Sequence, residues 1–179
     1  MRPVDQLYDV VVTTNSGYPL DQNLYQSVKG MSAAAKVVKP GGTIFCAAEC
    51  RDGIPEHGAY GEILASRSSP RELLEMITAP GYSRADQWQV QIQAQIQLRA
   101  RVLLKSDCLS SEQIRAAHFE PVADASTAIA EALRDAEYSE SQISDAVTRF
   151  ENVQRNGLSE VLAPKLRALP QHERWLGRN

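Results

Sequence analysis

Three polar side chains at helical spacing give the clearest sign of chemistry in this sequence of 179 residues. They are Tyr25, Gln26 and Lys29. Residues three or four apart lie on one side of a helix, so the phenol, the carboxamide and the ammonium would project together. Apolar positions such as Leu24 and Val28 fall on a different side, which can be buried. A cation, an amide and a phenol on a rigid element suit a small anionic ligand such as a carboxylate.

The helix that carries these residues is predicted to lie between two buried strands. Residues 7–14 are rich in valine and threonine and predict the first strand. Asp21 is expected to cap the helix, which should run to about Val38. A break over 39–42 then precedes a second strand over 43–48. Strand, helix and strand form a βαβ unit of a parallel sheet, in which ligands bind beyond the carboxyl ends of the strands.

Residues 88–102 fit two descriptions. Their apolar and polar side chains alternate, which is typical of a strand, but a strand of that length would span about 50 Å. Gln, Ala, Leu and Arg also favour helix, and Trp88 and Ile92 begin a row spaced by four. We therefore predict a helix to about Arg99, followed by a third strand over 101–106.

Further helices are expected where a capping residue precedes an amphipathic run. They should begin after Ser69, after Ser110 and near Asp124, where Asp124 or Ser126 would be the cap. A tail helix should cover 139–154, stop at Asn156-Gly157 and resume over 158–169, with 170–179 loose. The prediction is therefore a three-layer α/β domain over residues 1–137, with a mostly parallel sheet, and a helical tail over 138–179.

Composition narrows the classes of function. A net charge of −3 gives no electrostatic case for nucleic acid, and no apolar run approaches the ~20 residues that span a bilayer. The N-terminus lacks the apolar core of a secretory signal, so a cytoplasmic location is expected. The three cysteines have no Cys-x-x-Cys spacing and should be inert, and the three histidines lie at no metal-binding spacing. One of the histidines, His57, lies in a loop near the edge of the sheet where ligands are expected to bind.

The run from Asp9 to Met31, with Pro-Leu-Asp-Gln-Asn at its core, resembles the opening of the C-terminal domain of nickel-dependent lactate racemases, the LarA family. Three later blocks continue the resemblance in the same order: residues 41–44, residues 49–53 and Asp86-Gln87-Trp88. Together they cover about residues 3–137.

The resemblance implies a cofactor, a nickel-pincer nucleotide, that takes a hydride from C2 of a 2-hydroxy acid and returns it to either face. The tethering lysine and the histidines of that family lie in its N-terminal domain, and this chain begins after it. The resemblance thus implies a second wall of the cleft, with Tyr25, Gln26 and Lys29 beside substrate and cofactor and Trp88 over the pocket. Lys29 would pair with the substrate carboxylate. Without the N-terminal domain the chain is expected to be inactive.

Other readings stay open at this stage. The first three site residues could be ordinary helix surface, and Trp88 could be core. Residues 37–44 also resemble a late strand turn of Rossmann-like methyltransferases, although no glycine-rich loop precedes them. In the family, the domain closes with a short strand, whereas residues 138–179 of this chain are expected to be helical. Loss of that strand could leave an exposed sheet edge and so favour homo-oligomers. A non-enzymatic module that oligomerises or binds protein through this tail is the remaining alternative.

Overall fold

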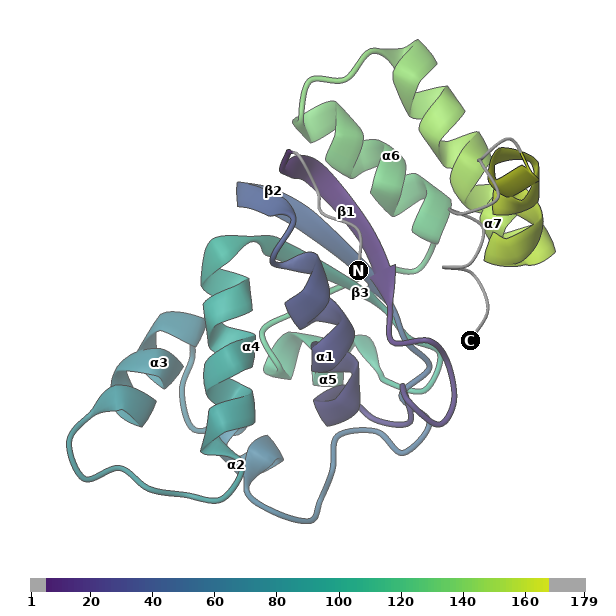
Figure 1. Cartoon of the computed structure of the whole chain (residues 1–179). Coiled ribbons are helices and arrows are strands. Elements are labelled where there is room, and N and C mark those ends of the chain that lie inside the picture. Colours follow the sequence, from purple (N-terminus) through teal and green to yellow (C-terminus); the bar gives the residue numbers. More distant parts are fainter. Residues whose placement is uncertain (1–5, 168–179) are drawn as a thin grey trace.

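A four-stranded parallel sheet lies between two layers of helices in the computed structural model, which describes the backbone of residues 6–167 and the side chains of residues 6–155 (Figure 1). The strand order is β1-β2-β3-β4, and each neighbouring pair is parallel. The strands are β1 (Tyr8–Thr14), β2 (Val38–Ala47), β3 (Arg101–Lys105) and β4 (Glu120–Pro121). This arrangement confirms the predicted α/β fold. Within the described residues, no helix combines the length and the apolarity that crossing a bilayer requires.

The two faces of the sheet carry separate apolar cores. Successive side chains of a strand point to opposite faces, so Ile44 and Cys46 of β2 enter the larger core and Phe45 enters the smaller one. The larger core is covered by α1 (Leu24–Ala34), α2 (Tyr60–Ala65), α3 (Pro70–Thr78), α4 (Gln87–Arg99) and α5 (Ser111–Ala116). The smaller core is covered by α6 (Ala125–Asp135) and α7 (Glu140–Arg167).

Helix α7 begins inside the predicted tail and packs on the sheet. Ile143 is buried in the smaller core, and the Phe150 ring meets the Phe45 ring edge to face at 6.1 Å between centroids. The predicted stop at Asn156-Gly157 is wrong, because α7 continues to Arg167. A single glycine inside a helix costs only about 1 kcal/mol, which does not end it. The predicted loose end at 170–179 lies outside the described residues.

The start of α1 differs from the prediction. Asn23, not Asp21, is the N-cap: its backbone is extended, and its side chain accepts a hydrogen bond from the Gln26 amide at 3.0 Å. The Asp21 carboxylate instead accepts from the Glu49 amide at 3.0 Å. Asp21 therefore joins the loop before α1 to the loop after β2, a role that depends on tertiary contact. The helix also ends at Ala34 rather than near Val38.

The break predicted over 39–42 lies inside β2. The register with β1 shifts there, because Tyr8 pairs with Val38 while Val10 pairs with Thr43. Gly41, with a φ of +79°, allows the extra residues to leave the ladder and return to it. The proline and glycines of this segment predict a turn, but inside a paired strand they produce a bulge.

The ambiguous segment 88–102 is helix followed by strand, as predicted. Helix α4 ends at Arg99, and β3 begins at Arg101. Three of its glutamines (Gln89, Gln93 and Gln97) bond carbonyls on other elements, so the alternating polar positions face inward in part. Buried polar side chains with long-range partners explain why the sequence pattern looked like a strand.

Candidate functional site

Helix α1 holds the three residues that first suggested chemistry. The ammonium of Lys29 donates to the Gln26 amide oxygen at 2.5 Å, and Lys29 is exposed. No carboxylate among the side chains of residues 6–155 lies within ion-pair distance of this ammonium. Lys29 is therefore held by a neutral group and keeps its charge available for an anion.

Tyr25 faces the neighbouring helices rather than Lys29. Its ring meets the Tyr60 ring at 5.3 Å and the Trp88 ring at 5.8 Å between centroids, both edge to face. Tyr60 is fully buried, Tyr25 is half-buried, and Trp88 remains 50% exposed. The structure thus brings Trp88 of α4 to Tyr25 of α1, and the three rings form an aromatic row that runs from the core to the surface. The place of Trp88 over a substrate pocket stays a prediction.

The surroundings of Tyr25 keep its phenol neutral. Burial raises the pKa of Tyr25 above its usual value near 10, and the nearby Asp86 carboxylate raises it further. The hydroxyl therefore stays protonated at neutral pH and can donate a hydrogen bond. Asp86 holds a left-handed backbone conformation at the start of α4, and its carboxylate accepts from the Ala59 amide at 3.1 Å.

Tyr25 and Gln26 line a common pocket of about 230 Å³ at the start of α1. Its other walls come from the loop after β2 and from the start of α4. The lining residues are Gln22, Asn23, Tyr25, Gln26, Pro55, His57 and Asp86. Sequence reasoning had noticed His57 only for its position near the cleft. It had placed Asp86 in a motif without giving it a role, and it had missed Gln22, which carries no local signal.

The polar groups of this pocket suit binding and orientation. They are side-chain amides, the Tyr25 phenol, the His57 imidazole and the Asp86 carboxylate, and Lys29 lies one turn further along α1. Among the described side chains, no group of three His, Cys, Asp or Glu residues could hold a metal ion. Cys46 is buried, and burial raises its pKa to about 12, so its thiol is protonated near neutral pH. These residues do not form a nickel site by themselves.

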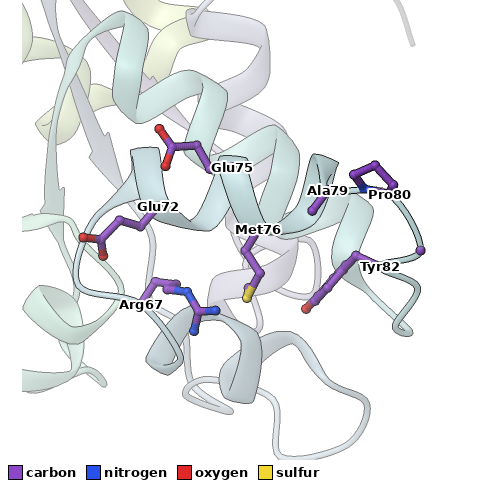
Figure 2. A pocket seen from close by; sticks show the side chains of 8 residues that line it. Arg67, Glu72, Glu75, Met76, Ala79, Pro80 and Tyr82 are labelled. Carbon is purple, nitrogen blue, oxygen red and sulfur yellow. The ribbon is translucent and has the colours of Figure 1, made fainter.

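A larger and more open hollow of about 780 Å³ lies between α3 and the loop that follows it (Figure 2). Its lining residues are Arg67, Glu72, Glu75, Met76, Ala79, Pro80, Gly81 and Tyr82. Glu72 already accepts hydrogen bonds from the Ser68 amide and hydroxyl, which lowers the pKa of its carboxyl. The hollow contains none of the site residues expected from the sequence.

A third hollow, of about 450 Å³, lies where a parallel sheet is expected to bind ligands. Thr14, Ala47 and Lys105, the last residues of β1, β2 and β3, share it with the polar loops that follow. Gln154 of α7 also lines it. Its charges are largely paired, since Lys105 meets Asp107 and Glu49 meets Arg51 at 3.2 Å. The charge that remains here is the negative one of Asp21, whose Oδ1 has no hydrogen-bond partner among the described residues, whereas Lys29 offers a positive charge on α1.

Comparison with known proteins places this geometry in a family. Residues 4–150 match the model of the lactate racemase C-terminal domain. The chain is 40% identical over 131 residues to the lactate racemase of Thermoanaerobacterium thermosaccharolyticum, covering 72% of this chain and 30% of that protein. It is 43% identical over 114 residues to the lactate racemase of Lactiplantibacillus plantarum, covering 63% and 27% respectively.

A solved structure agrees with this assignment. The lactate racemase apoprotein of Thermoanaerobacterium thermosaccharolyticum superposes with a TM-score of 0.66 at 36% sequence identity, covering 71% of this chain and 31% of that one. The chain thus spans about 30% of the length of the first relative it matches.

Proposed function

The chain belongs to the lactate racemase C-terminal domain family, and we propose that it supplies the substrate- and cofactor-facing wall of a nickel-dependent 2-hydroxy-acid racemase. The observation that carries the proposal is the ammonium of Lys29, which has no carboxylate partner among residues 6–155 and donates to Gln26 at 2.5 Å on the helix that also presents Tyr25 to Trp88. An N-terminal lactate racemase domain would supply the other wall and the catalytic groups.

Each of the four residues then has a role in binding and orientation. Lys29 pairs with the carboxylate of the 2-hydroxy acid, and charge-assisted hydrogen bonds of this kind are stronger than neutral ones. Gln26 holds Lys29 in place and offers its remaining amide hydrogens nearby. The neutral Tyr25 phenol donates a hydrogen bond, and Trp88 covers the site and limits access of water. Fixing the substrate in this way lowers the entropic part of the barrier.

The nickel-pincer nucleotide enters the proposal through the family resemblance alone. When bound, it supplies the exchange of a hydride at C2 of the hydroxy acid. The described residues offer it a polar and aromatic wall but no metal-binding cluster. We therefore assign to this chain only the holding and shielding of the substrate. Family membership leaves the methyltransferase reading without support.

The test is racemisation by this chain mixed with a cofactor-loaded N-terminal lactate racemase domain. Lys29→Met should lower kcat/KM by about 10- to 100-fold, since a hydrogen bond to a charged group is worth about 1.5–3 kcal/mol. Lys36→Met is the matched control, because Lys36 is also an exposed lysine and lies just beyond the end of α1. Equal kcat/KM for Lys29→Met and the unaltered chain would remove Lys29 from the site.

A further inference from the structure

Three glutamines on α4 form a row spaced by four residues, and each donates its side-chain amide to a carbonyl outside the helix. Gln89 donates to the Tyr25 carbonyl at 2.7 Å. Gln93 donates to the Ala117 carbonyl at 2.8 Å, and Gln97 donates to the same carbonyl at 3.0 Å and to that of His118 at 2.9 Å. The row therefore fastens α4 to α1 at one end and to the segment after α5 at the other.

The bond made by Gln89 falls on a residue of the proposed site. Gln89 is 1% exposed, and a buried amide needs a partner. A carbonyl inside an α-helix already accepts the amide hydrogen four residues later, so α1 does not need this second bond to form. Its effect is to fix the distance between α1 and α4 at Tyr25. Trp88, whose ring contacts Tyr25, is the residue next to Gln89.

The same row also holds the other ring that touches Tyr25. The Tyr60 hydroxyl donates to the Gln93 amide oxygen, and the Tyr60 ring meets Tyr25 edge to face at 5.3 Å. Tyr25 therefore lies between two rings whose places are tied to Gln89 and Gln93. Gln97 shares the Ala117 carbonyl with Gln93, but both of its partners lie after α5, and neither belongs to the three rings.

We propose that Gln89 is a positioning residue that sets the Tyr25–Trp88 ring pair of the substrate-facing wall through its bond to the Tyr25 carbonyl. The catalytic consequence rests on the function proposed above, whereas the structural coupling does not. The two parts are therefore measured separately.

The structural coupling is measured by fluorescence of Trp88 in a Trp175→Phe background, where Trp88 is the only tryptophan. Gln89→Met keeps the length of the side chain and removes the donor, so Trp88 emission should shift to the red and acrylamide quenching should increase. Gln97→Met removes the same kind of bond from the same helix and should leave Trp88 unchanged. If circular dichroism shows that Gln89→Met is unfolded, Gln89→Asn, which is one methylene shorter, takes its place with the same expectation.

The catalytic consequence is measured in the mixture with the N-terminal domain. Gln89→Met should lower kcat about tenfold or more, because misplacing a positioning group by about 1 Å can cost up to ~100-fold, while Gln97→Met should match the unaltered chain. Unchanged Trp88 fluorescence, an equal shift in Gln97→Met, or a shift with unchanged kcat would each overturn the proposal. If the unaltered mixture is inactive, the proposed function fails, and the fluorescence alone decides whether Gln89 positions the ring pair.

Discussion

Single residues of this chain take their chemistry from burial as much as from type. Tyr25 and Tyr60 are both tyrosines in one aromatic row, and burial raises the pKa of each, most strongly for the fully buried Tyr60. Tyr25 also lines the pocket at the start of α1. Two lysines likewise differ in their surroundings. Lys29 has a neutral partner, whereas Lys39 is paired with the Asp9 carboxylate at 2.7 Å. An unpaired charge beside a pocket is the stronger sign of ligand binding.

The thiols give a residue-scale prediction. Cys46 is buried with a pKa raised to about 12, burial also raises the pKa of Cys50, and Cys108 is exposed. A raised pKa lowers the fraction of the thiol that is present as thiolate, which is the reactive form. At about pH 8, a disulfide reagent should therefore modify one thiol of the native chain quickly and all three only after denaturation. Cys108→Ser should abolish the fast reaction, and rapid modification of that variant would contradict the burial of the other two.

At the scale of elements, Gly30 allows α1 to pack closely on the end of β1. A Cβ on Gly30 would lie 2.5 Å from the Thr14 carbonyl oxygen, which is closer than such atoms approach. The sequence alone shows only the intrinsic cost of a glycine inside a helix. The structure supplies the reason for it, since α1 approaches the end of β1 closely at Gly30.

Gly30→Ala should therefore destabilise the chain although alanine is the better helix former. Overpacking typically costs about 1–3 kcal/mol, which should appear as a lower denaturant midpoint. Gly61→Ala is the matched control, because its Cβ would lie 3.3 Å from a methyl group of Ile54 and the helical gain should offset that contact. Equal midpoints for the two variants would show that α1 can shift on β1 without loss.

At the scale of the whole molecule, α7 completes the second helical layer. Ile143 is buried in the smaller core, and Phe150 packs on Phe45 of the sheet. The family match also extends to residue 150, into this helix. The division of the chain at residue 137 stays a prediction, but the packing of α7 makes the start of the tail part of the same core.

Ending the chain after Tyr138 should lower the free energy of unfolding by about 2–4 kcal/mol, since a fully buried side chain such as Ile143 contributes about 1.5–3 kcal/mol and the partly buried Phe150 contributes less. The uncovered apolar face should also cause association, visible by light scattering. A chain ended after Arg167 keeps α7 and serves as the control. Unchanged stability and size in the shorter chain would show that α7 is not needed to cover the sheet.

The isolated chain should bind lactate weakly or not at all. Among the described residues, the pocket beside Tyr25 has walls from the loop before α1, α1 itself, the loop after β2 and the start of α4, and the proposed partner wall lies in another domain. Titration calorimetry should therefore give a dissociation constant in the millimolar range or above, an affinity of about −4 kcal/mol or weaker. Micromolar binding by the chain alone would contradict the need for a second wall.

Local sequence determined most of the elements of this protein. Ser69, Ser110 and Asp124 each cap a helix as predicted, because a cap depends on amides only two or three residues away. The helix over 87–99 and the strand after it also followed from nearby residues. So did the parallel βαβ unit, since strand, helix and strand occur in order with turns between them.

Tertiary contact decided the rest. Asp21 had the right chemistry for a cap, but its carboxylate bonds to Glu49 in another loop. The turn signals at Pro40 and Gly41 became a bulge because β1 holds both sides of that segment in one sheet. Tyr25 meets Trp88, and His57 joins their neighbourhood, only through the packing of α1 against α4 and the loop after β2. Spacing along the chain fixes which side chains share a helix face, but distances between elements arise from the packing of many side chains at once.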